Sequence, residues 1–213
     1  MSKLRLTITM SLDGYVAGAD QSEENPLGVA GMELHEWFFP LKEFREMHGQ
    51  QGGETNASSP VVEERRANIG ATIMGRNMFG PVRGPWPDES WRGWWGEDPP
   101  YHHPVFVLTH HRREPLEMKG GTTFHFVSEG IESALTQAEN AAQGGDIWLA
   151  GGASVSNQYL AARLVDEIDI SIAPVILGAG ERLFEGIDGG SVKLKQIRAV
   201  EAPGVTHIKY DFS

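Results

Sequence analysis

Short apolar runs alternate with amphipathic stretches along the whole chain, and glycine or a polar turn closes each run. Runs of this length between turn residues predict strands. The expected strands cover residues 4–10, 69–74, 104–109, 122–127 and 146–150. Residues 168–172 and 174–177 add a strand pair or one bent strand, ended by Gly178 and Gly180. Two final segments, residues 192–200 and 205–212, flank Pro203-Gly204 and predict a terminal antiparallel hairpin.

Between these strands, apolar residues recur at helical spacing. Leu34, Trp37, Phe38, Leu41 and Phe44 predict one amphipathic helix over roughly residues 33–48. A helical turn is expected within residues 61–68, and two further helices over residues 131–143 and 154–164. Residues 13–18, 50–60 and 80–104 predict loops, and the last of these contains Trp86, Trp91, Trp94 and Trp95.

Strands that alternate with helices and then end in a hairpin predict an α/β fold. We expect three α/β/α layers around a mixed, mostly parallel sheet with a C-terminal antiparallel hairpin. Residues 1–213 are expected to form a single domain, because α/β domains commonly reach this length. Residues 19–68 look like an extended loop and helix insertion within it.

The composition excludes or disfavours several classes of ligand and site for this chain. A formal net charge of −11 disfavours nucleic acid and anionic membranes, which bind clustered positive charge. The chain has no cysteine, which excludes disulfides, thiolate metal sites and cysteine nucleophiles. No apolar run reaches the roughly 18 residues of a membrane span, and the first residues do not resemble a signal peptide. We therefore expect a cytoplasmic protein with a small-molecule substrate.

The strand over residues 146–150 ends in Gly151-Gly152-Ala153-Ser154, where a helix is expected to begin. Glycine lets a ligand approach the backbone, and the N–H groups of a first helical turn favour an anion such as a pyrophosphate. A tight turn with Ser154 as the helix N-cap is the alternative.

Two other strand ends carry groups that suit a phosphate. Gly75-Arg76-Asn77 follows one strand, and Arg76 could bind the 2′-phosphate of NADPH or simply lie at the surface. Thr109 and His110 end another strand. Ligands of α/β sheets gather beyond the carboxyl ends of strands, so we expect these groups to meet. The paired histidines at 102–103 and 110–111 lack partners at ligand spacing, so no metal site is expected.

In this order, the segments resemble the dihydrofolate reductase-like superfamily, in its riboflavin-biosynthesis reductase (RibD C-terminal domain-like) branch. The resemblance rests on residues 9–17, 74–76, 107–109, 151–153, 159–160, 164–167 and 173–184, and so spans nearly the whole chain. It implies that Gly151 and Gly152 lie beneath the cofactor pyrophosphate and that Gly75 and Arg76 hold the adenosine phosphate. It also implies that Met10, Asp13 and Ala17 flank the nicotinamide. Met78 stands where many relatives have threonine.

The activity that this resemblance implies is NADPH-dependent reduction of a small pterin-like, pyrimidine-like or carbonyl substrate by a homodimer. The alternative is a non-catalytic homodimer that binds NADP(H). Asp13, Glu36 and water are the candidate proton donors, although Glu36 also suits a solvated helix face. Trp37 is the candidate substrate contact. The tryptophan-rich loop could stack on a flat ring or serve to bury itself.

Overall fold

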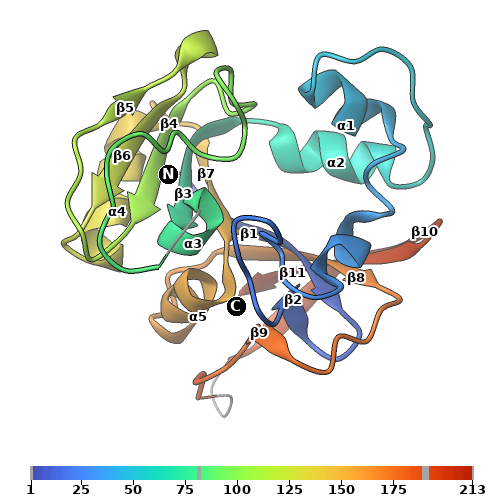
Figure 1. The fold of residues 1–213 in the computed structure, drawn as a ribbon. Helices are drawn as coiled ribbons and strands as arrows, with labels where there is room; N and C mark the ends of the chain where they lie inside the picture. The colour runs from blue at the N-terminus through green and yellow to red at the C-terminus, as the bar shows by residue number, and fades with distance from the viewer. Residues whose placement is uncertain (1, 81–82, 189–191, 213) are drawn as a thin grey trace.

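A nine-stranded mixed sheet forms the centre of the protein in a computed structural model that describes residues 2–80, 83–188 and 192–212 (Figure 1). The spatial order is β10 (Leu194–Ala202), β11 (Val205–Phe212), β8 (Glu167–Ala173), β1 (Leu4–Ser11), β7 (Asp146–Gly151), β3 (Ile69–Gly75), β4 (Pro104–Leu108), β6 (Thr123–Val127) and β5 (Leu116–Glu117). The six strands from β8 to β6 run parallel to one another, and β5 is antiparallel to β6. β11 is antiparallel to both β8 and β10, which confirms the mostly parallel sheet with a C-terminal hairpin.

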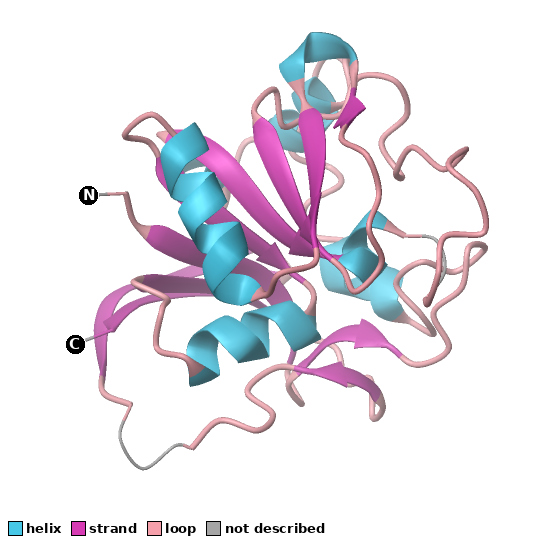
Figure 2. Cartoon of the chain, turned by 90° about the vertical axis from the view of Figure 1, so that its left-hand side faces the viewer, coloured by secondary structure: helices cyan, strands magenta, loops and turns pink. Residues whose placement is uncertain are grey.

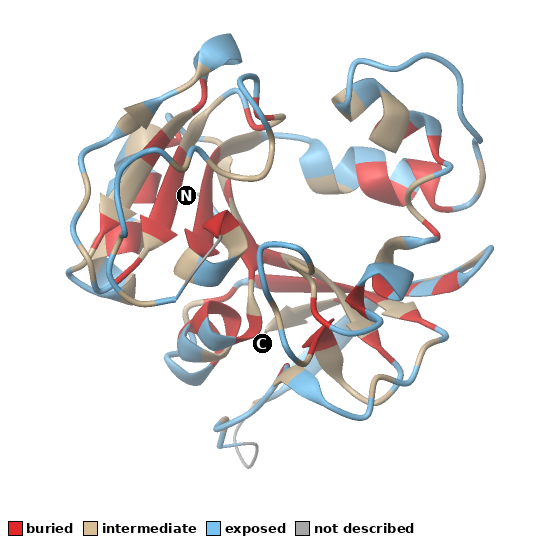
Figure 3. Cartoon of the chain, in the orientation of Figure 1, coloured by how far each residue is buried: buried red, intermediate tan, exposed pale blue. Residues whose placement is uncertain are grey.

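Helices cover the two faces of this sheet unequally. They are η1 (Gly31–His35), α1 (Lys42–Met47), α2 (Ser59–Arg66), α3 (Arg76–Phe79), η2 (Lys119–Gly121), α4 (Ile131–Ala141) and α5 (Ala153–Ala161). Figure 2 shows α4 and α5 lying against one face. Buried apolar residues of α4, α5 and the central strands form the largest core cluster beneath them, and buried residues accordingly concentrate in these strands in Figure 3.

The helix expected over residues 33–48 is wrong as a single element. The chain forms η1, turns through Pro40 and starts again as α1. Proline offers no backbone N–H and disfavours helical geometry in the residue before it, so the apolar spacing continues while the helix does not. Leu41 is instead extended, and the Lys42 N–H donates to the Glu54 carbonyl oxygen at 2.8 Å.

The strand expected over residues 174–177 is also absent from the described chain. β8 ends at Ala173, and Gly180 opens a strand rather than closing one. This strand, β9 (Gly180–Arg182), pairs antiparallel with β2 (Tyr15–Gly18), a segment expected to be a loop. Strands of three or four residues carry too little alternation to be read from a sequence.

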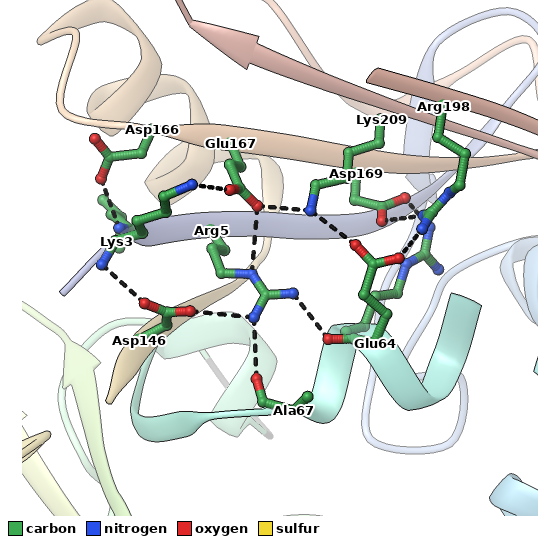
Figure 4. Close-up of polar contacts among 12 residues, drawn as sticks. Lys3, Arg5, Glu64, Ala67, Asp146, Asp166, Glu167, Asp169, Arg198 and Lys209 are labelled. Atoms are coloured by element: carbon green, nitrogen blue, oxygen red, sulfur yellow. Dashed lines mark hydrogen bonds and ion pairs between the residues drawn. The ribbon is translucent and has the colours of Figure 1, made fainter. Parts of the chain in front are cut away.

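Charged side chains attach α2 to the sheet (Figure 4). Arg5 of β1 donates to the carbonyl oxygens of Glu64 at 2.9 Å and Ala67 at 3.1 Å, at the C-terminal end of α2. Lys209 of β11 lies 2.9 Å from the Glu64 carboxylate and 2.8 Å from that of Glu167. A cation at a helix C-terminus satisfies free carbonyl groups and complements the helix dipole. These contacts hold α2 on the sheet face opposite α4.

Asp169 of β8 joins a second part of this network. It is 5% exposed, and its two oxygens accept hydrogen bonds from Arg65 at 2.5 Å and from Arg198 at 2.6 Å. Arg65 depends on this carboxylate, because removing one member of a buried ion pair leaves the other charge uncompensated, whereas Arg198 also pairs with Glu64.

We therefore expect Asp169→Ala to lower the free energy of unfolding by about 3 kcal/mol in chemical denaturation. The matched control is Glu97→Ala, which breaks an ion pair between Glu97 and Lys119 that is exposed on both sides. This control should leave the unfolding curve unchanged, because both groups are solvated without each other. Equal effects of the two substitutions would contradict the role given to Asp169.

Candidate functional site

A cleft of about 940 Å³ crosses the sheet face that α4 and α5 leave uncovered. Its floor consists of the β1 and β7 residues Thr7, Thr9, Trp148 and Ala150. One wall comes from η1, α2 and the segment that joins them, which we call the η1–α2 wall. It includes His35, Trp37, Phe38, Phe44, Val62 and Arg65. The opposite wall comes from the loop before β4 and includes Trp94, Trp95, Tyr101, His102 and His103.

Pairing between β3 and β7 brings two of the expected phosphate-binding segments together. Met74 is in register with Gly151, and a Cβ atom added to Gly75 would lie 3.7 Å from the backbone nitrogen of Gly152. Gly151 has a φ of +106°, a conformation that residues with side chains rarely adopt. Its peptide bond to Gly152 is cis. Arg76 and the start of α5 consequently lie at the same edge of the sheet.

The first turn of α5 begins directly after this glycine pair. Its N-cap is Gly152, so Ser154 lies inside the first turn and the alternative of a Ser154 cap is wrong. The first intrahelical bond runs from the Ser156 N–H to the Gly152 carbonyl oxygen at 3.0 Å. The N–H groups before it have no acceptor within the helix, and such groups suit an anion.

Arg76 lies at this edge without an acidic partner among the described residues. Its Nη1 donates to the Gly80 carbonyl oxygen, and its Cζ is 3.4 Å from the centre of the Trp86 ring. Its Nε and Nη2 atoms are buried and have no hydrogen-bond partner in the described part of the chain. Burial lowers the pKa of Arg76 to about 10, and repulsion from Arg113 adds to this effect. The guanidinium remains charged at neutral pH, and an anionic ligand would compensate it.

The cleft brings most of the expected site residues together. Its lining includes Ala17, Trp37, Gly75, Arg76, Asn77, Thr109, His110, Gly152, Ala153 and Ser154. Thr109 joins this group because β4 pairs with β3, with Leu108 opposite Gly75. Met10, Asp13, Glu36 and Gly151 are not part of the lining. Met10 packs toward the core under α4 and α5, and Glu36 is exposed.

Asp13 has a different set of partners. Its carboxylate accepts hydrogen bonds from Ser11 Oγ at 2.7 Å, the Gly178 N–H at 2.7 Å and the Leu177 N–H at 3.1 Å. These bonds, led by that from Ser11, lower the pKa of Asp13 to about 2. The group is therefore ionised at neutral pH and holds residues 177–178 near the end of β1. A catalytic role for Asp13 or Glu36 stays a prediction that neither position supports.

The ionisable side chains that line the cleft are mostly arginine and histidine although the chain is acidic. Six of the eight histidines line it, namely His35, His48, His102, His103, His110 and His111. So do four arginines, Arg65, Arg66, Arg76 and Arg83. Among the described lining residues the only carboxylate is that of Glu181, which lies 2.6 Å from Arg83. The sequence shows both histidine pairs, at 102–103 and 110–111, but not that they face one cleft.

A buried histidine positions two residues of the η1–α2 wall. His207 of β11 is fully buried, with Nε2 2.9 Å from Ser58 Oγ and Nδ1 2.9 Å from Ser171 Oγ. Ser171 Oγ also accepts a hydrogen bond from Arg65 at 2.8 Å. The Trp37 ring packs edge-on against the imidazole, with ring centres 4.9 Å apart. Trp37 and Arg65 are thus fixed from the side away from the cleft.

Burial, with a smaller effect of Arg65, lowers the pKa of His207 to about 4. In the unfolded chain the residue takes up a proton near pH 6.5, whereas the folded protein keeps it neutral. The free energy of unfolding should therefore fall as the pH drops from 6.5 toward 4, by on the order of 2 kcal/mol for this residue between pH 7 and pH 5. Denaturation at both pH values should show a loss smaller by about this amount in His207→Gln. An identical loss in wild type and variant would refute the buried neutral imidazole.

The described residues contain no candidate for a metal site or for a membrane-spanning helix. No group of three or more histidine, aspartate or glutamate side chains there is placed to bind a metal ion. None of the helices in that part of the chain is long and apolar enough to cross a membrane.

Residues 2–206 match the family model of the RibD C-terminal domain. The uncharacterized protein YyaP of Bacillus subtilis (strain 168) is 29% identical over 122 residues, which are 55% of this chain and 64% of that protein. The match therefore spans slightly less than two thirds of this relative.

Two solved structures show the fold. A putative riboflavin biosynthesis protein from Shewanella sp. PV-4 superposes with a TM-score of 0.63 at 20% identity, over 100% of this chain and 99% of that one. Dihydrofolate reductase from Enterococcus faecalis, complexed with NADP(H), gives a TM-score of 0.51 at 13% identity, over 99% and 96% of the two chains.

Proposed function

This chain belongs to the RibD C-terminal domain family, and from that membership we propose that it is an NADPH-dependent reductase of a small heterocyclic or carbonyl substrate. One observation carries the proposal beyond the fold. The partly unpaired guanidinium of Arg76 and the free N–H groups at the start of α5 lie at the same edge of one cleft. A ligand with two separate phosphate groups suits this pair of sites.

The residues present fit NADPH. The buried Nε and Nη2 atoms of Arg76 lack acceptors among the described residues, and a phosphate supplies them. We assign the 2′-phosphate to Arg76 and Asn77, and the pyrophosphate to the N–H groups of residues 152–154. Thr109 and His110 lie beside them and are assigned to the adenosine half. The bound cofactor would supply the hydride.

The chain's own contribution to the chemistry is positioning and the exclusion of bulk water. The aromatic walls of the cleft suit a flat ring held against the floor. Asp13 is ionised and lies outside the lining, and Glu36 is exposed, so we propose that water in the cleft donates the proton. Homodimer assembly and a cytoplasmic location stay predictions from the sequence.

The second candidate function is a binding protein that uses the same cleft without turnover. The observation in its favour is that the described lining contains no carboxylic acid except Glu181, which is paired with Arg83. Titration with NADPH, followed by absorbance at the nicotinamide band with pterin, pyrimidine and carbonyl compounds, separates the two. Binding followed by oxidation supports the reductase. Binding without oxidation by any compound supports the second function, and absence of binding contradicts both.

Arg76→Ala tests the assignment of the 2′-phosphate. We expect a loss of about 10- to 100-fold in affinity for NADPH, because hydrogen bonds between charged groups contribute about 1.5–3 kcal/mol. NADH lacks the 2′-phosphate, so its affinity should change by less than about threefold. Calorimetric titration of both cofactors measures the difference. Equal losses for NADPH and NADH would remove this role from Arg76.

A further inference from the structure

The far end of the cleft, away from the start of α5, contains chemistry that the proposed cofactor does not use. Trp148 on the floor precedes Gly152 by four residues. A strand rises about 3.3 Å per residue, so Trp148 lies roughly 13 Å from the pyrophosphate assigned to Gly152. We call the surroundings of Trp148 the far end of the cleft.

The register of three adjacent strands shows which elements surround Trp148 at the far end of the cleft. Arg5 of β1, Trp148 of β7 and Thr72 of β3 are in register, so their side chains share one face of the sheet. Arg5 contacts the C-terminal end of α2, which puts Arg66 and Ala67 at one side of Trp148. On the other side, the Thr72 hydroxyl lies 2.7 Å from His103 Nε2.

Arg66 is the cation at this end that has no other described role. It is exposed and lines the cleft, and its guanidinium has no hydrogen bond or ion pair with another described residue. The neighbouring Arg65 is already bound to Asp169 and Ser171. Arg66 is also not required as a helix cap, because Arg5 donates to the carbonyl groups at the end of α2.

The other groups at the far end are aromatic or neutral. The ring centres of Tyr101 and Trp148 are 6.0 Å apart, which forms an aromatic surface. Burial, with repulsion from His102, lowers the pKa of His103 to about 4, so this imidazole is neutral at neutral pH. The Nε1 atom of Trp148 is buried without a hydrogen-bond partner among the described residues. A guanidinium without another partner can bind a carboxylate through two parallel hydrogen bonds, and the aromatic surface beside it suits a planar ring that carries the carboxylate.

We propose that the far end of the cleft is a carboxylate subsite, in which Arg66 binds the acidic group of a planar aromatic molecule whose ring lies against Trp148. We take this molecule to be the substrate of the reductase, and that identification alone rests on the proposed function. The subsite itself is a binding property of Arg66 and the neighbouring strands.

The test uses two probes that share a planar ring and differ in charge, 2-naphthoate and 2-naphthamide. Calorimetric titration of the full chain, with and without saturating NADPH, measures the affinity of each. We expect 2-naphthoate to bind about tenfold more tightly than the amide, because the amide cannot form a charged pair with Arg66. Arg66→Gln should reduce this preference to about twofold or less.

The matched control is Lys195→Gln, which removes one positive charge from the exposed edge strand β10. It should keep the tenfold preference, because the effect depends on contact and not on net charge. Equal binding of the two probes, or an unchanged preference in Arg66→Gln, would overturn the subsite. Displacement of 2-naphthoate by NADPH would also overturn it, by assigning the acid to the cofactor end. If NADPH itself fails to bind while the preference and its loss are observed, the subsite stands and the proposed reductase function fails.

Discussion

Parallel hydrogen bonding between β3 and β7 is the constraint on which the candidate site depends. The two strands are far apart in sequence. β3 ends in Gly75 and is followed by the short helix α3, and β7 ends in Gly151 and is followed after Gly152 by the longer helix α5. Their register puts Met74 opposite Gly151, so Arg76 and the N–H groups after Gly152 reach the same edge of the sheet. A shift of one strand by one residue would turn its side chains to the opposite face of the sheet and separate these groups.

The second wall of the cleft is held by charge rather than by a large apolar core. Arg5 and Lys209 attach α2 to the sheet, and Asp169 with His207 fixes Arg65 and Trp37 from behind. The buried apolar cluster of this wall is small, consisting of Trp37, Leu41, Val62 and Val205. The carboxylates of Glu64, Glu167 and Asp169 are engaged in this network, and the lining of the cleft contains mainly arginine and histidine among its ionisable groups in a chain of net charge −11.

Local patterns explain what the sequence could predict. The central strands, the hairpin and the Gly151-Gly152 turn depend on alternation and turn residues that lie close together in the chain, and they were found. The prediction of a continuous helix over residues 33–48 failed because the apolar spacing continues across Pro40, whereas the helical backbone does not. The β2–β9 pair joins segments more than 160 residues apart, and the anchoring of α2 joins Arg5 to Glu64. Such contacts depend on how elements pack, which one sequence without an alignment does not reveal.

Phosphorus-31 NMR of NADPH bound to the wild-type protein tests the central claim most directly, because it observes both phosphate sites in one ligand. The account predicts that the pyrophosphate and 2′-phosphate resonances both move from their free positions. It also predicts that the 2′-phosphate loses its second proton at a lower pH than in free NADPH, since a neighbouring guanidinium favours the dianion. Unchanged positions of both resonances in a complex at saturation, or a 2′-phosphate that titrates as in free NADPH, would contradict the convergence of Arg76 and the start of α5 on a single cofactor.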